Sequence, residues 1–149
     1  MITFRRITAD EVPQAAEFAA GGMDLARHPG VRLSQAKMIE VARHFAASTA
    51  DFHLAAFDEA QRLVGVIAAC VTEMLTFERC EAHVVLCQAR GVPGVGRTLI
   101  AELRRWADED MRVRRIQFPE EIGARPGFAR LLRRYGFTRV QRVCLYEKE

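Results

Sequence analysis

The sequence has no run of 18 apolar residues, no C-x-x-C pair and no H-E-x-x-H motif. These absences exclude a membrane-spanning helix and leave neither a redox dithiol nor a zinc-protease pattern. The first ten residues also lack the apolar stretch of a signal peptide. We therefore predict a cytoplasmic protein without a membrane partner and without a metal.

Cysteine is scarce as well, with four residues, three of which lie inside apolar runs. A thiol in such a run usually serves packing, so we expect reduced, buried cysteines rather than disulfides. A chain of 149 residues, half of them hydrophobic, can bury a core of its own without a covalent staple. The composition therefore predicts one globular domain over residues 1–149.

Lysine is nearly missing, because 20 of the 22 basic residues are arginines. Charge is also uneven: residues 1–89 carry 8 basic and 11 acidic groups, whereas residues 90–149 carry 14 basic and 8 acidic groups. The basic second part suggests an anionic ligand. Acidic residues interrupt it throughout, so no basic stripe for nucleic acid is present, and a phosphorylated small molecule fits better.

The pattern of apolar residues predicts an alternation of strands and helices. Thr8 and Glu11 form a capping box for a first helix, and Ser34 is a good N-cap for a second. Hairpin-length loops join three central strands, which predicts an antiparallel sheet there, and the whole order predicts a mixed α/β fold. The expected strands are 4–7, 52–57, 63–74, 80–88, 113–118 and 137–146, and the expected helices are 8–20, 35–45, 95–106 and 126–135.

A glycine-rich loop at 91–98 lies between strand 80–88 and the body of the helix that follows it. Glycines let the main chain approach a ligand closely, and a helix N-terminus points unpaired N–H groups toward an anion. One interpretation is a tight turn without a ligand. A second is the phosphate-binding loop of nucleotide triphosphatases, from which Gly91 to Thr98 differs by having Arg97 in place of lysine.

A third interpretation covers nearly the whole chain. Gly94-Val95-Gly96 and the helix after it match the signature (Q/R)-x-x-G-x-(G/A), and residues 129–137 are similar to the passage A-x-x-L-Y-x-x-x-G-F. With the order of elements, these motifs resemble the GNAT superfamily of acetyl-CoA-dependent N-acetyltransferases. The resemblance implies a mostly antiparallel sheet, flanked by about four helices, in which one strand splays from its neighbour at the coenzyme site.

The same resemblance implies acetyl-CoA as the cofactor. The glycine loop would hold its pyrophosphate, and the end of the preceding strand would pair with the pantetheine amides. The sequence departs from the family where Gly91 replaces a Gln or Arg and where Pro126 replaces a common Asn. The predicted cofactor-binding residues are Leu86, Cys87, Gln88, Arg90, Gly91, Gly94, Val95, Gly96, Arg97 and Thr98.

Acetyl transfer to an amine needs a base and often an acid for the coenzyme thiolate. Strand alternation places Glu81 and His83 on one face, together with Val85 and Cys87, and either Glu81 or His83 is a candidate base. A solvated pair without a catalytic role fits the same pattern.

The predicted acid is Tyr135. Leu132 stands at the position of the family tyrosine, and Tyr135 follows it by nearly one helical turn.

We therefore predict an N-acetyltransferase that acts on a primary amine of a small molecule or peptide. A GNAT-derived binding protein that has lost turnover is the alternative. Nucleic acid is not an expected partner. The apolar segment 137–146 is compatible with a homodimer and with a monomer alike.

Overall fold

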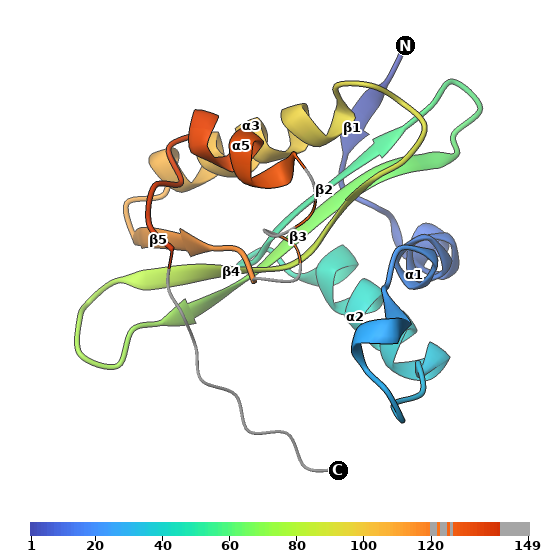
Figure 1. Cartoon of the computed structure of the whole chain (residues 1–149), viewed down its shortest axis with the longest axis horizontal. Helices are drawn as coiled ribbons and strands as arrows, with labels where there is room; N and C mark the ends of the chain where they lie inside the picture. Colours follow the sequence, from blue (N-terminus) through green and yellow to red (C-terminus); the bar gives the residue numbers. More distant parts are fainter. Residues whose placement is uncertain (120–121, 123–124, 126, 141–149) are drawn as a thin grey trace.

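The computed structural model describes residues 1–119, 122, 125 and 127–140, whose strands form one sheet in the order β1-β2-β3-β4-β5 (Figure 1). Neighbouring strands pair antiparallel from β1 to β4, and β4 pairs parallel with β5. This confirms the predicted mixed, mostly antiparallel sheet. The strands are β1 (Thr3–Arg5), β2 (Phe52–Phe57), β3 (Leu63–Glu73), β4 (Cys80–Ala89) and β5 (Val113–Gln117).

Helices cover both faces of the sheet, with α1 and α2 on one face and α3 and α5 on the other (Figure 1). Two of the predicted starts are confirmed: Ser34 caps α2 by accepting from Lys37 N–H at 3.3 Å, and α3 begins directly after Gly94. In the described part of the chain, no helix is long and apolar enough to cross a membrane. The helices are η1 (Ala9–Glu11), α1 (Val12–Gly21), η2 (Leu25–Arg27), α2 (Gln35–Ala47), α3 (Val95–Glu109) and α5 (Phe128–Arg134).

The end of the chain differs from the prediction. Residues 137–140, expected to begin a last strand, are not in a strand, and residues 141–146 lie outside the described part. The preceding helix begins at Phe128, with Gly127 at its N-cap, so it is shorter than the predicted 126–135. Gly136, with φ near +87°, follows this helix and ends it as the sequence predicted.

Two hydrophobic clusters hold the layers together, one on each face of the sheet. Beneath α3, strand residues such as Ile67 and Ala82 pack against Leu99 and Leu103, and all four are completely buried. Glycine at position 65 lets α3 come close to the sheet. A Cβ atom on Gly65 would lie only 2.5 Å from Cγ1 of a buried α3 valine, so the absence of a side chain there sets the distance between helix and sheet.

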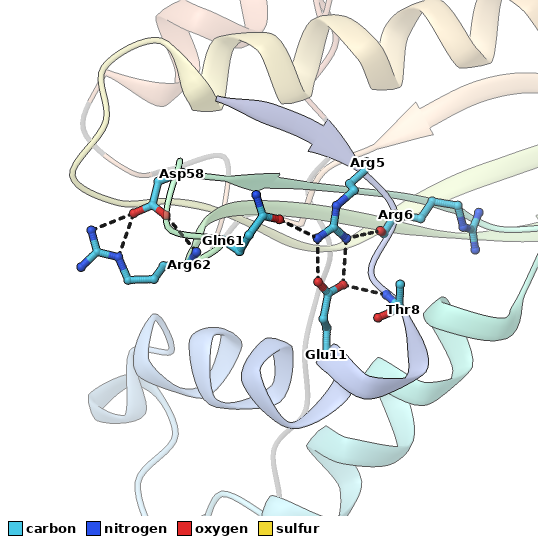
Figure 2. A network of polar contacts seen from close by, with 7 residues as sticks. All are labelled: Arg5, Arg6, Thr8, Glu11, Asp58, Gln61 and Arg62. Carbon is cyan, nitrogen blue, oxygen red and sulfur yellow. Dashed lines mark hydrogen bonds and ion pairs between the residues drawn. The ribbon is translucent and has the colours of Figure 1, made fainter. Parts of the chain in front are cut away.

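An ion pair fixes α1 to the first strand (Figure 2). Both carboxylate oxygens of Glu11 accept from the Arg5 guanidinium, at 2.6 and 2.8 Å, and one also accepts from Thr8 N–H at 2.8 Å. The predicted capping box is therefore present, although the helix opens with the 3₁₀ turn η1. The Arg5 guanidinium and, to a smaller extent, the Thr8 N–H lower the pKa of Glu11 to about 2.

Glu11→Gln keeps a side chain that can bond to Thr8 N–H but removes the charge that pairs with Arg5. A carboxyl whose pKa is lowered by folding stabilises the native state above its unfolded pKa of about 4.3, and this stability is lost as the pH falls toward about 2. We expect the variant to lose about 1 kcal/mol of unfolding free energy near pH 7 and progressively less below about pH 5. Urea unfolding across this range measures the difference.

The matched control is Glu17→Gln, which removes a carboxylate from an exposed position of the same helix. A loss in Glu11→Gln that does not change with pH would contradict the assigned ion pair.

Candidate active site

The parallel pair β4–β5 opens partway along its length. Pairing ends at His83 and Gln117, whereas β4 continues to Ala89. From Val84 onward, the side of β4 that faces away from β3 therefore has no strand partner in the described residues. This is the strand splay that the sequence resemblance predicted.

The register of β3 and β4 shows which backbone groups face the opening. Arg90 N–H donates to Val64 O at 2.9 Å, so this pair belongs to the hydrogen-bonded set of the ladder. Bonded and non-bonded pairs alternate in an antiparallel ladder, and Cys87, opposite Ile67 and three residues from Arg90, belongs to the non-bonded set. Cys87 thus directs its backbone N–H and C=O away from β3 and into the splay.

A β-bulge changes the predicted alternation of side chains along β4. Val85 has no partner in β3, because Val84 and Leu86 pair with successive residues of that strand. An unpaired residue of this kind inverts the faces of everything that follows it. Cys87 therefore points to the same face as Val84, into the core beneath α3, and its predicted position beside the catalytic candidates was wrong.

Burial makes the Cys87 thiol a packing group. The residue is 4% exposed, and desolvation raises the pKa of its thiol to about 12. A catalytic thiolate is excluded on this ground, and only the backbone of Cys87 faces the splay.

The glycine loop leads from this strand into α3 by two left-handed residues, Gly91 with φ near +71° and Gly94 with φ near +86°. A Cβ atom at either position would meet nothing within 4 Å, so conformation rather than crowding requires glycine there. Gly94 is the N-cap, and no side chain of the described residues caps the helix. The first-turn N–H groups of Val95, Gly96 and Arg97 therefore have no partner within the helix.

The other loop residues support this geometry. Val95 is buried against the sheet, and Arg97 is exposed at the mouth of the helix. Thr98 binds Gly94 O with both its backbone N–H (3.0 Å) and its hydroxyl (3.2 Å), so its side chain holds the turn.

Two of the predicted cofactor-binding residues direct their side chains to α1 and not toward the glycine loop. Gln88 donates to Ala19 O at 3.0 Å, and Arg90 donates to Phe18 O and to Gln88 Oε1 while its guanidinium lies 4.3 Å above the Phe18 ring. Gly22 completes this contact, because a Cβ there would overlap the Gln88 amide. Both side chains clamp the C-terminus of α1 onto the end of β4.

Glu81 and His83 do lie on one face of β4, beside the point where the splay begins. The carboxylate of Glu81 accepts from Arg115 and, at 3.2 Å, from Gln117, both on β5. Its Oε2 also lies 3.3 Å from His83 Nε2. The Glu81 side chain is only 13% exposed, whereas that of His83 is 39% exposed, so the imidazole is the more accessible of the two candidate bases.

Arg115 and Gln117 were not among the predicted site residues. Their only signal is the i, i+2 spacing on a predicted strand, and nothing in the sequence showed which strand would lie beside β4.

Cys70 is the β3 residue directly opposite His83. Its pKa is raised, mainly by burial and also by the nearby Asp51 carboxylate, so a neutral thiol faces the imidazole.

Tyr135 is not close to this cluster. It ends α5 and packs against the core beneath α3, and its carbonyl accepts from Arg104 of that helix. There it lines an open groove of about 890 Å³ between α3, β5 and the β3–β4 hairpin. Glu81 and His83 lie on the opposite face of the sheet, so Tyr135 and the candidate bases do not converge. Leu132, at the family tyrosine position, is itself buried in the core.

No group of three His, Cys, Asp or Glu side chains in the described ranges could hold a metal ion. The site is therefore built from an open strand backbone, an uncapped helix start and the cluster around Glu81. The protein is therefore an α/β domain with one parallel strand pair among its described strands, and this pair opens beside the glycine loop.

Comparison with known proteins identifies the fold. The sequence matches no protein-family model and no curated protein. Among solved structures, a GNAT-family acetyltransferase from Streptococcus pneumoniae has a TM-score of 0.69 at 16% identity, over 91% of this chain and 83% of that one. Arabidopsis thaliana NAA60 in complex with acetyl-CoA has a TM-score of 0.68 at 15% identity, over 95% and 86%. A transcriptional regulator from Bacillus halodurans C-125 has a TM-score of 0.75 at 18% identity, over 99% and 100%.

The chain thus has the fold of the GNAT acetyltransferases. Because β4, which precedes the glycine loop, pairs antiparallel with β3 in this fold, the alternative of a nucleotide triphosphatase loop on a parallel sheet is not supported.

Alanine substitutions at Gly94 and Gly96 should have opposite effects on the free energy of unfolding. Gly94→Ala forces a side chain into the left-handed region and should lower the unfolding free energy by about 1 kcal/mol. Gly96→Ala, inside the first turn of α3 and 3.6 Å from Ala89 Cβ, should be neutral or stabilise by up to about 1 kcal/mol. Thermal unfolding of both variants checks this, and equal losses would contradict the assigned loop conformation.

Proposed function

We propose that this protein transfers an acetyl group from acetyl-CoA to a primary amine. One observation carries the proposal: the open backbone of Cys87 in the β4–β5 splay leads directly into the uncapped N-terminus of α3. Together they offer a strand edge for an amide-containing chain and a ring of N–H donors for a diphosphate. The acetyl-CoA complex of the similarly folded NAA60 supports this choice of ligand.

The coenzyme phosphates are assigned to the first turn of α3. N–H groups of Val95, Gly96 and Arg97 point out of the helix end, and the left-handed Gly91 and Gly94 keep the approach free of side chains. Arg97 adds a positive charge at the mouth. Thr98 acts indirectly by holding the turn.

The pantetheine arm is assigned to the splayed strand. Of the three residues predicted there, Cys87 presents its N–H and C=O to the opening, whereas Leu86 and Gln88 belong to the set whose backbone faces β3. The thioester would then lie near the start of the splay at His83, where the polar cluster begins.

His83 is proposed as the base and Glu81 as a positioning residue. The amine nitrogen attacks the acetyl carbonyl, an N–C bond forms, the C–S bond breaks, and the amine proton passes to the imidazole. Glu81 is engaged by Arg115, Gln117 and the Nε2 side of His83, so its carboxylate orients the ring. With Tyr135 on the other face of the sheet, the coenzyme thiolate leaves without a positioned tyrosine.

The acceptor is proposed to be an amine of a small molecule or peptide. The loop around residues 21–33 and the β3–β4 hairpin at 74–79 are the segments proposed to select it.

Calorimetric titration with acetyl-CoA, followed by thiol release on a panel of amines, tests the proposal. Binding together with thiol release supports the transferase. Binding without release on any amine favours the alternative, a GNAT-derived binding protein, and the absence of binding leaves only the fold.

Substitutions of His83 and Glu81 should affect kcat to different extents. His83→Ala should lower kcat by about 100-fold or more while coenzyme affinity is unchanged, because the imidazole accepts the proton without contacting the coenzyme phosphates. Glu81→Gln should lower kcat by about 10-fold, because the imidazole loses the carboxylate contact that orients it.

Glu73→Gln is the matched control, since Glu73 is an exposed carboxylate at the end of the adjacent strand β3. If both His83→Ala and Glu81→Gln leave the pH–rate profile of the wild type unchanged, the assignment of the base is wrong.

A further inference from the structure

The Cys87 carbonyl, which faces the splay, already accepts a hydrogen bond. Arg125 donates from Nη1 to Cys87 O at 2.8 Å, although 38 residues separate the two in sequence. Because the Cys87 carbonyl faces away from β3 and β5 has diverged at this level, neither of these two strands donates a hydrogen bond to it. The guanidinium therefore fills the place of a strand partner.

Both backbone polar groups of Arg125 have hydrogen-bond partners. Its N–H lies 3.4 Å from the carbonyl of Ile122, a residue buried in the core beneath α3, and its carbonyl accepts from Phe128 N–H at 3.0 Å, at the start of α5. The side chain thus reaches the splay from an anchored position, while the residue as a whole is exposed to solvent.

We propose that Arg125 occupies the hydrogen-bond position that a pantetheine amide takes on Cys87, so that the coenzyme arm and the guanidinium exclude each other. This inference rests on the proposed function. A partly buried carbonyl without a donor is unfavourable, and a charged donor satisfies it better than a neutral amide does. Arg125 therefore keeps the splayed strand satisfied in the free protein and competes with the pantetheine arm.

The assignment gives Arg125 a role opposite to that of a phosphate ligand. A phosphate ligand strengthens binding through its charge, whereas Arg125 weakens the binding of any chain that donates to Cys87 O. Removing the Arg125 side chain should therefore strengthen coenzyme binding if it competes with the pantetheine arm and weaken binding if it holds a phosphate. If Arg125 has no role in binding, the affinity should not change.

The test compares the wild type with Arg125→Ala by calorimetric titration with coenzyme A and with adenosine 3′,5′-bisphosphate, which lacks the pantetheine arm. We expect Arg125→Ala to bind coenzyme A about five- to ten-fold more tightly, because one charge-assisted hydrogen bond no longer has to be broken. Affinity for the bisphosphate should be unchanged. Arg125→Lys, which keeps a cationic donor, should lie between the two proteins.

Arg130→Ala is the matched control, because it removes an equal charge from an exposed position on α5. It should leave both affinities at the wild-type value. Thermal unfolding of each variant shows that it is folded.

Each outcome of the titrations either supports or overturns the inference. Unchanged or weaker binding of coenzyme A by Arg125→Ala, with a wild type that binds, overturns this inference and leaves the proposed function standing. No binding by either protein overturns the proposed function and this inference with it. Binding by Arg125→Ala alone supports the exclusion in its strongest form.

Discussion

The end of the β4–β5 pairing at His83 and Gln117 is the constraint on which the candidate site depends. Before this point, a shared ladder brings Glu81 beside its β5 partners and builds the polar cluster. Beyond it, β4 keeps one neighbouring strand among those that the structure describes, and its backbone becomes available to other donors and acceptors. A sheet in which the two strands stayed paired would satisfy Cys87 internally and leave no place for an extended ligand.

Most of the architecture could be predicted from local signals. Thr8 with Glu11, and Ser34, marked helix starts by capping chemistry, and apolar runs separated by short polar turns marked an antiparallel meander. The glycine spacing before Val95 predicted both the loop and the splay, through its resemblance to the GNAT signature. The last predicted strand was not found at residues 137–140, because alternation in the sequence does not reveal whether a segment finds a partner.

The site was harder to predict, because its details depend on long-range contacts. The extra residue at Val85 inverted the face of Cys87, and periodicity alone cannot reveal a bulge. Gln88 and Arg90 looked like ligands in a basic, glycine-rich context, yet their side chains bind carbonyls of α1. Tyr135 was placed by distance along a helix, whereas the sheet separates it from His83. Arg125 carried no sequence signal at all.

The clamp between Gln88 and the end of α1 separates a helix that is fixed to the sheet from the segment that follows it. Helix α1 up to Gly22 is tied to β4, and the chain leaves this attachment at Met23. The segment from there to the start of α2 contains the 3₁₀ turn η2, and most of its described residues are exposed. The proposed selection of an acceptor would thus fall to an exposed segment that begins at a helix end fixed to the sheet.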